Sequence, residues 1–276
     1  MLINISGRTD IVNYYSDWMF KRFEEGYALS RNSLFPNSVR RYELTPEKVD
    51  CIIFGSKNFS PVLGRIHEIT EKFPTYFHYT VTAYGKDVEP GVPDIDASME
   101  TFRYIAKGLE GQFDRCIFSF VEMYKKHEVN FPELIPLTEA DKREIAAGIG
   151  KIAREQGFIL QTCGPEADYA PYGILSSGCI TLDILGRANG LRFRNLKHQG
   201  FRQGCHCMQS RDIGALNSCL NGCKYCYANK NAQLPRENYA LHDPDSPLLI
   251  GHLKPTDRLE PGAQKSFLMK EDQRRA

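Results

Sequence analysis

Short apolar runs of strand length alternate with amphipathic stretches along much of the chain. Each run is followed by polar residues, and the runs cover residues 2–6, 51–54, 75–82, 115–120 and 158–161. Between them, apolar residues recur at helical spacing, as at residues 62–69 and 99–109, and Thr138 with Asp141 is typical of a capped helix start. Alternating strands and helices predict a parallel sheet. We therefore expect an α/β fold, as a partial or open (β/α) barrel of TIM type.

The pattern also divides the chain into a structured body and a loop-like C-terminal part. Within the body, apolar runs at residues 27–31 and 39–44 flank a turn-prone loop and predict a hairpin. After Gly190 the chain becomes basic and irregular, and most of its cysteines follow. We expect an α/β partial barrel at residues 1–190 and a cysteine-rich segment and tail, packed on it, at residues 191–276.

Composition narrows the classes of function. A net charge of +1 over 276 residues creates no overall field for nucleic acid or an anionic membrane, so such binding needs a local patch, such as the basic residues 192–202. No apolar run reaches the ~18 residues of a membrane-spanning helix, and the N-terminus lacks the apolar core of a signal peptide. We expect a cytoplasmic protein with no membrane partner, in which the nine cysteines are metal ligands or thiols rather than disulfides.

Three cysteines share one turn-prone segment. Cys219, Cys223 and Cys226 have C-x-x-x-C-x-x-C spacing around Gly222. This spacing lets three thiolates face one point, and such groups bind zinc or iron–sulfur centres. A structural zinc normally has four protein ligands, so three thiolates leave one coordination position open for chemistry.

Further thiols are candidates for a second metal site: Cys163, Cys179, Cys205 and Cys207. Together they have the ligands for a tetrahedral ion. Alternatively, Cys207 is a fourth ligand of the first centre, or all four are small buried thiols. Cys51 and Cys116 lie inside apolar runs, and we expect them in the core.

Polar residues that follow the predicted strands are candidates for binding a cofactor or substrate, because reactive groups gather at the carboxyl ends of parallel strands. The candidates are Arg8, Asp10, Lys57, Asn58, Thr82 and Glu122. Taken singly, each is more often a helix cap or a solvated loop residue.

Several motifs together resemble a bacterial family described as a domain of unknown function. They lie at residues 6–10, 31–32, 56–58, 80–87, 119–126, 172–174, 205–229 and 242–247. The C-terminal cysteines of that family are similar to the cluster motif of radical S-adenosylmethionine (SAM) enzymes, and the spore photoproduct lyase branch is the most similar. The resemblance implies a barrel of radical-SAM type and a lyase or related enzyme of unknown substrate.

The resemblance also implies a cofactor arrangement. Cys219, Cys223 and Cys226 would hold a [4Fe-4S] cluster whose fourth iron binds the amino and carboxylate groups of SAM. We expect Lys57 or Arg8 to pair with the SAM carboxylate, and Asp10 or Glu122 with its amine. The chain departs from the pattern in three respects: its cysteine motif lies near the C-terminus, it has no Gly-Gly-Glu type segment for the methionyl amine of SAM, and one barrel unit is missing before the strand at Cys116.

An alternative from another class is a zinc-stabilised, non-enzymatic module. It would use the cysteines to stabilise the fold and the basic residues 192–202 to bind nucleic acid. Iron rather than zinc in the purified protein distinguishes the enzyme from this module.

Overall fold

The computed structural model describes residues 1–79, 95–108, 110, 115–120, 125–132, 136–163, 168–176, 178–194 and 206–269. The chain forms two compact units. The first unit comprises Met1–Thr80, Leu182–Leu196 and Gln209–Ala276. The second comprises Val81–Thr181 and Lys197–Met208. The chain therefore leaves and re-enters each unit, and the segment with Cys219 belongs to the same unit as the N-terminus. The predicted division at residue 190 stays a prediction.

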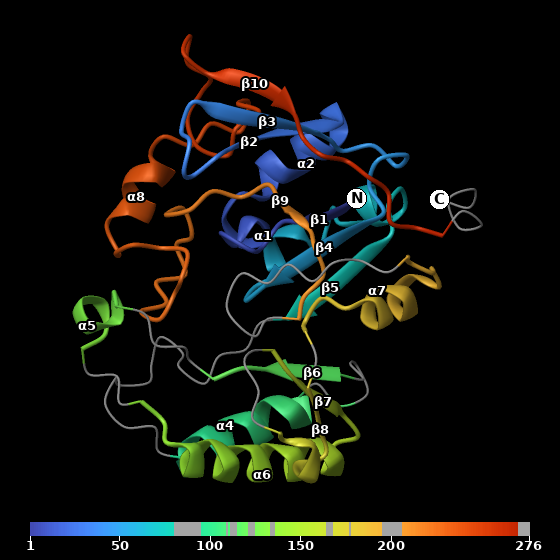
Figure 1. The fold of residues 1–276 in the computed structure, drawn as a ribbon, viewed down its shortest axis with the longest axis vertical. Helices are drawn as coiled ribbons and strands as arrows, with labels where there is room; N and C mark the ends of the chain where they lie inside the picture. Colours follow the sequence, from blue (N-terminus) through green and yellow to red (C-terminus); the bar gives the residue numbers. More distant parts are fainter. Residues whose placement is uncertain are drawn as a thin grey trace. The chain divides into compact units, whose positions relative to one another are not determined.

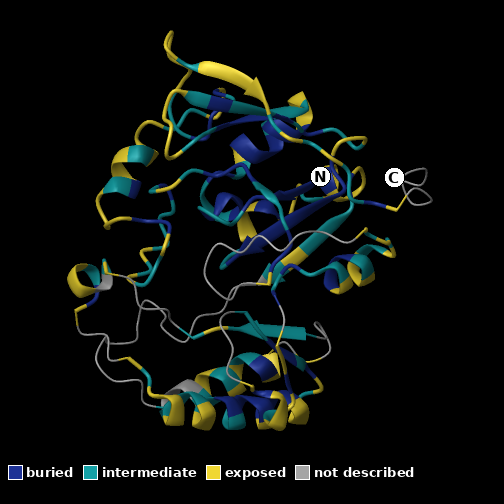
Figure 2. Cartoon of the chain, in the orientation of Figure 1, coloured by how far each residue is buried: buried dark blue, intermediate teal, exposed yellow. Residues whose placement is uncertain are grey.

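A four-stranded parallel sheet forms the centre of the first unit (Figure 1). Its order is β5-β4-β1-β9, with β1 at Leu2–Asn4, β4 at Cys51–Ser56, β5 at Thr75–Tyr79 and β9 at Arg211–Asp212. Every residue of β1 and β4 is buried (Figure 2). Strands buried on both faces read as continuous apolar runs, which is why these two strands stand out in the sequence.

Helices and a smaller sheet complete the first unit. The helices are α1 (Ile11–Tyr14), α2 (Ser16–Glu25), η1 (Ser60–Val62), α3 (His67–Thr70), α7 (Leu182–Asn189) and α8 (Leu234–Tyr239). Helix α2 ends at Gly26, whose φ of 77° is readily adopted only by glycine. The chain then enters the predicted hairpin, which is confirmed: β2 (Tyr27–Arg31) pairs antiparallel with β3 (Ser38–Glu43). The exposed strand β10 (Arg258–Pro261) adds parallel to β3.

The second unit contains a three-stranded parallel sheet in the order β6-β7-β8 (Figure 1). Its strands are β6 (Arg115–Phe118), β7 (Ile159–Thr162) and β8 (Ile174–Ser176), and its helices are α4 (Ile95–Gly108), α5 (His127–Asn130), α6 (Glu139–Glu155) and η2 (Ala170–Tyr172). The predicted capping box is present, because Thr138 and Asp141 each accept a hydrogen bond from the other's backbone N–H. Buried residues of α6, among them Ile149 and Ile152, form the core of this unit with Leu160 of β7.

The α/β class and the parallel sheets are confirmed, whereas a closed barrel is not shown by the described residues. The helix expected at residues 62–69 is confirmed only in part. The structure has η1 and the short α3 separated by a turn that contains Gly64, a residue that disfavours a helix interior. Of the run expected at 75–82, only the part to Tyr79 lies within the described residues.

Cys51 and Cys116 were expected in the core. Cys51 is fully buried, and Cys116 is half-buried against the core of the second unit. Burial raises the pKa of Cys51 to about 12 and that of Cys116 to about 11, so both remain neutral thiols near pH 7. Within the described part of the chain, no helix has both the length and the apolar character that crossing a bilayer requires.

Trp18 of α2 is the largest side chain in the core of the first unit, and we expect its removal to be costly. It is fully buried, and its indole N–H donates to the Ser246 carbonyl at 2.8 Å. Trp18→Ala should lower the free energy of unfolding by about 3–5 kcal/mol. Phe35→Ala, at an exposed position, should change it by less than about 0.5 kcal/mol. Urea unfolding followed by circular dichroism measures both, and equal effects would contradict the assignment of this core.

Candidate metal centres

The loop that carries Cys219, Cys223 and Cys226 is closed by its own hydrogen bonds. The Asn217 N–H donates to the Ala228 carbonyl at 3.0 Å, and the Asn229 amide donates to the Cys219 carbonyl at 2.7 Å. Between Cys223 and Cys226 the backbone forms a turn, in which the Cys226 N–H donates to the Cys223 carbonyl at 3.0 Å. These contacts hold the three cysteines in one compact loop.

This loop lies beside the carboxyl ends of β1 and β4, and Asp10 connects the two. Asp10 caps α1 by accepting from the Asn13 N–H at 3.2 Å. It also accepts from the Ser56 hydroxyl at 2.8 Å and from the Lys57 N–H at 3.2 Å, both at the end of β4. A fourth donor comes from the cysteine loop, the Asn221 amide at 3.1 Å. Asp10 is therefore a buried acceptor that joins the sheet, the helix and the loop.

Lys57 faces the same loop. Its ammonium lies 3.4 Å from the Tyr225 hydroxyl and 5.9 Å from the centre of that ring. Burial alone lowers the pKa of Lys57, but Tyr225 and Cys223 together raise it above its usual value. A charged lysine thus lies next to the central cysteine of the motif.

The three thiols of the motif share one electrostatic neighbourhood. Burial raises the pKa of Cys219, backbone N–H groups of Asn221 and Asp10 oppose this, and the charges of Cys226 and Asp10 raise it again. Burial, followed by the charges of Cys219, Asp10 and Cys223, also raises the pKa of Tyr14. Several negative groups therefore meet here, and a bound cationic centre would offset their repulsion.

The remaining strand-end candidates are placed differently. The Arg8 guanidinium lies 3.5 Å from the Gly214 carbonyl. The Asn58 amide donates to the side chain of Asn13 at 3.0 Å and supports α1 rather than the cysteine loop. Thr82 and Glu122 lie outside the described residues. The structure therefore brings Asp10 and Lys57, two of the strand-end candidates, to the cysteine loop.

Asp212 of β9 is a buried acid that we did not predict as a site residue. Its Oδ1 accepts from the Gly214 N–H at 2.7 Å. Burial raises the pKa of Asp212 to about 6, while the positive charge of Arg8 acts in the opposite direction. A Cβ at Gly7 would lie 2.1 Å from Oδ2 of Asp212, so a side chain at residue 7 would displace this carboxylate. The sequence signal was the D-I-G at residues 212–214, which belongs to one of the motifs behind the family resemblance.

The raised pKa of Asp212 predicts a loss of stability as the pH rises. The folded state holds this proton up to about pH 6, whereas the unfolded chain releases it near pH 4. The folded state thus binds more protons between these values, and the free energy of unfolding falls by about 3 kcal/mol across the interval. Urea unfolding from pH 4 to 7 should show this slope, and Asp212→Asn should flatten it. An unchanged slope in the variant would contradict the assignment.

A second group of cysteines lies in the second unit. The sulfurs of Cys163, Cys179 and Cys207 all lie within 4.8 Å of one another. Those of Cys179 and Cys207 are 3.2 Å apart. This group could bind a metal ion. Three of the four thiols considered for a second site are thus brought together, and Cys205 lies outside the described residues. In the part of the chain that the structure describes, the first group does not meet this close spacing.

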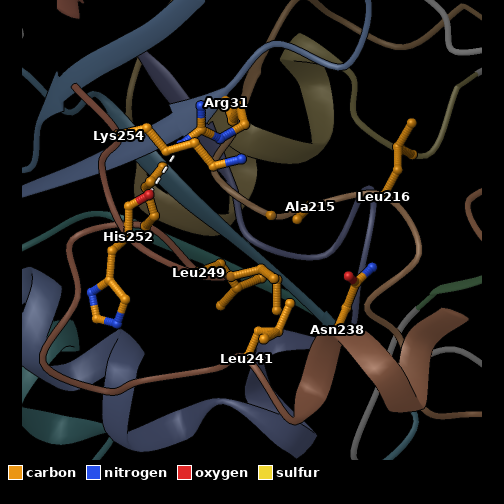
Figure 3. Close-up of a pocket in the computed structure, with 12 residues that line it drawn as sticks. Arg31, Ala215, Leu216, Asn238, Leu241, Leu249, His252 and Lys254 are labelled. Carbon is orange, nitrogen blue, oxygen red and sulfur yellow. Dashed lines mark hydrogen bonds between the residues drawn. The ribbon is translucent and has the colours of Figure 1, made fainter. Parts of the chain in front are cut away.

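The first unit also contains a cavity of about 260 Å³ (Figure 3). Its walls include Leu241, Leu249 and the backbone that precedes the cysteine loop. The basic side chain at its rim, Arg31, is held by Asp257 through two contacts of 2.5 and 2.7 Å and donates to the His252 carbonyl at 3.2 Å. The charge of Arg31 is thus neutralised within the chain, and no cysteine lines this cavity.

The fold and the cysteine groups define an α/β protein with parallel sheets and a group of three thiols that could hold a metal. The model of a domain of unknown function, DUF1848, matches residues 2–107 and 94–228. These segments cover most of the chain, so the protein belongs to this family. No curated protein and no solved structure matches the chain.

The two matched segments overlap at residues 94–107, most of which lie in α4. The missing barrel unit before β6 stays a prediction.

Proposed function

We propose that this protein is an iron–sulfur protein of the radical SAM type, in which Cys219, Cys223 and Cys226 hold a [4Fe-4S] cluster. The observation that carries the proposal is the position of the cysteine loop, beside Asp10 and Lys57 at the carboxyl ends of β1 and β4. Reactive centres of parallel α/β proteins gather at that edge. With three thiolate ligands, one coordination position remains for a cofactor.

We assign the following roles to the polar neighbours. Lys57 would bind the carboxylate of SAM, because its ammonium lies beside Tyr225 and the charge of Cys223 favours its protonated form. Asp10 has four donors of the chain on its two oxygens, so it is a positioning residue rather than a partner of the SAM amine. A cluster held by Cys219, Cys223 and Cys226 would supply, when reduced, the one electron that cleaves bound SAM.

The strand orders support a barrel of radical-SAM type. The four-stranded sheet and the three-stranded sheet β6-β7-β8 are parallel throughout, and apart from β9 their strands run in chain order, as in a (β/α) barrel. The missing unit would leave such a barrel partial or open. Because iron–sulfur centres and free thiols persist in reducing compartments, we propose the cytoplasm as the location.

Anaerobic reconstitution tests this proposal. The protein should take up about four irons per chain. With dithionite as reductant and SAM, it should release 5′-deoxyadenosine and methionine in equal amounts. Lys57→Met should keep the iron but bind SAM at least tenfold more weakly, whereas Lys224→Met is the matched control on the loop. A protein with its full iron that neither binds nor cleaves SAM would overturn the SAM part of the proposal.

The alternative is a zinc-stabilised, non-enzymatic module, which the close spacing of Cys163, Cys179 and Cys207 favours. Its nucleic-acid partner has less support. The backbone N–H of Arg194 donates to Phe267 at 2.7 Å and its guanidinium donates to Ser266, so part of the basic stretch binds the chain itself. Zinc at both cysteine groups and no iron after anaerobic purification would favour this module over the enzyme.

A further inference from the structure

We propose that Cys163, Cys179 and Cys207 bind a single zinc ion, separate from the centre at Cys219, Cys223 and Cys226. The site holds the segment with Cys207 against the carboxyl ends of β7 and β8 within the second unit. This inference does not depend on which metal the first centre binds.

The sulfur spacing fits one ion. The three sulfurs lie within 4.8 Å of one another, and the closest pair is 3.2 Å apart. These values bracket the roughly 3.8 Å that tetrahedral zinc imposes on its thiolates. Three thiolates are also the soft donors that zinc prefers among divalent ions. The spacing is too close for thiolates on separate irons of a cluster.

Three separate parts of the chain deliver the thiols to one place. Cys163 follows the last residue of β7, and its N–H donates to the Phe118 carbonyl of β6 at 2.9 Å. Cys179 comes shortly after β8. Both follow parallel neighbouring strands, so they emerge at the same edge of the sheet. Convergence of residues this far apart in the sequence is a property of the fold rather than of a local motif.

Cys207 is brought to this edge by a close approach of two backbones. The Met208 N–H donates to the Ile180 carbonyl at 2.8 Å. A Cβ at Gly178 would lie 2.7 Å from the backbone nitrogen of Cys207, so only glycine allows this approach. The carbonyl of Gly178 accepts from the side chain of Gln161, which is fully buried in β7. The scaffold of the site is therefore held by hydrogen bonds that do not involve the thiols.

The burial of the group suits a structural ion. Cys207 is 3% exposed, and the other two cysteines are half-buried. Two thiolates 3.2 Å apart repel each other strongly in such a place, and a divalent cation between them removes this repulsion. Structural zinc sites have four protein ligands, and the sequence offers His206 next to Cys207.

The ion would have a role in the architecture of the chain. The segment Lys197–Met208 belongs to the second unit, whereas the stretches before and after it belong to the first. Cys207 lies near the end of this segment, upstream of Cys219. An ion on Cys207 would therefore fix the chain just before it continues toward the cysteine loop of the first unit.

Metal analysis tests the site. Protein purified with zinc present should hold about one zinc that resists dialysis. Cys163→Ser, Cys179→Ser and Cys207→Ser should each weaken zinc binding at least tenfold, as measured by competition with a chelator. Cys116→Ser, in the same unit but outside the group, should keep the ion. The variant C219A/C223A/C226A should also keep it, which separates this inference from the proposed function.

Cobalt provides a second measurement of metal binding, which does not require the ion to stay bound during dialysis. Cobalt added to the metal-free protein should give the intense near-ultraviolet thiolate bands of a tetrahedral site, and Cys207→Ser should remove most of that intensity while Cys116→Ser leaves it. Two outcomes overturn the proposal: zinc content unchanged in all three serine variants, or a Cys179–Cys207 disulfide in protein purified under reducing conditions. Circular dichroism confirms that each variant is folded before its metal binding is compared with that of the unaltered protein.

Discussion

The variant C219A/C223A/C226A should lose essentially all of the iron that the reconstituted protein holds, about four atoms per chain. The three thiolates are the iron ligands we propose, and no other ligand in the described part of the loop replaces a sulfur. The loop should survive, because its closing hydrogen bonds come from Asn217, Asn229 and backbone groups. Iron and acid-labile sulfide analysis, together with the broad visible absorption of the cluster, measures the loss.

The control for this prediction is C163S/C179S/C207S, which removes the same number of thiols from the other group. It should keep its iron at the first centre while losing the zinc. Iron retained by the alanine variant would show that the cluster ligands lie elsewhere, and the proposed function would then be wrong.

Asp10→Ala should lower the free energy of unfolding by about 2–4 kcal/mol. The substitution removes the carboxylate that accepts from the Lys57 N–H and one of two acceptors of the buried Ser56 hydroxyl, and it also removes the cap of α1. It further breaks the contact with Asn221, which joins the cysteine loop to the sheet. Iron binding should therefore weaken together with stability. Urea unfolding and iron titration measure the two effects.

Asp17→Ala is the matched control, because Asp17 is an exposed aspartate in the first turn of α2. It should change stability by less than about 0.5 kcal/mol. Asp10→Asn should lower the free energy of unfolding by an amount between those of Asp10→Ala and Asp17→Ala. The asparagine carbonyl still accepts hydrogen bonds, whereas its NH₂ group cannot accept from the remaining donors. If Asp10→Ala behaved like Asp17→Ala, Asp10 would not have the connecting role that we assign to it.

Sequence patterns determined the strands that are long or fully buried. The runs around β1 and β4 are continuous because parallel strands bury both faces, and the capping box of α6 is encoded within four consecutive residues. By contrast, β8, β9 and β10 left no readable pattern. They are two to four residues long, and β9 is a strand only because it pairs with β1.

The sequence also determined which residues have the chemistry for a metal, since the spacing of Cys219, Cys223 and Cys226 is local. Only the tertiary structure decided how the others combine. Cys163, Cys179 and Cys207 meet because β7 and β8 end at one edge and Gly178 lets a distant backbone approach. Asp10 was expected to meet a cofactor, but four donors from three parts of the chain converge on its carboxylate. Such contacts depend on long-range packing, which no local periodicity encodes.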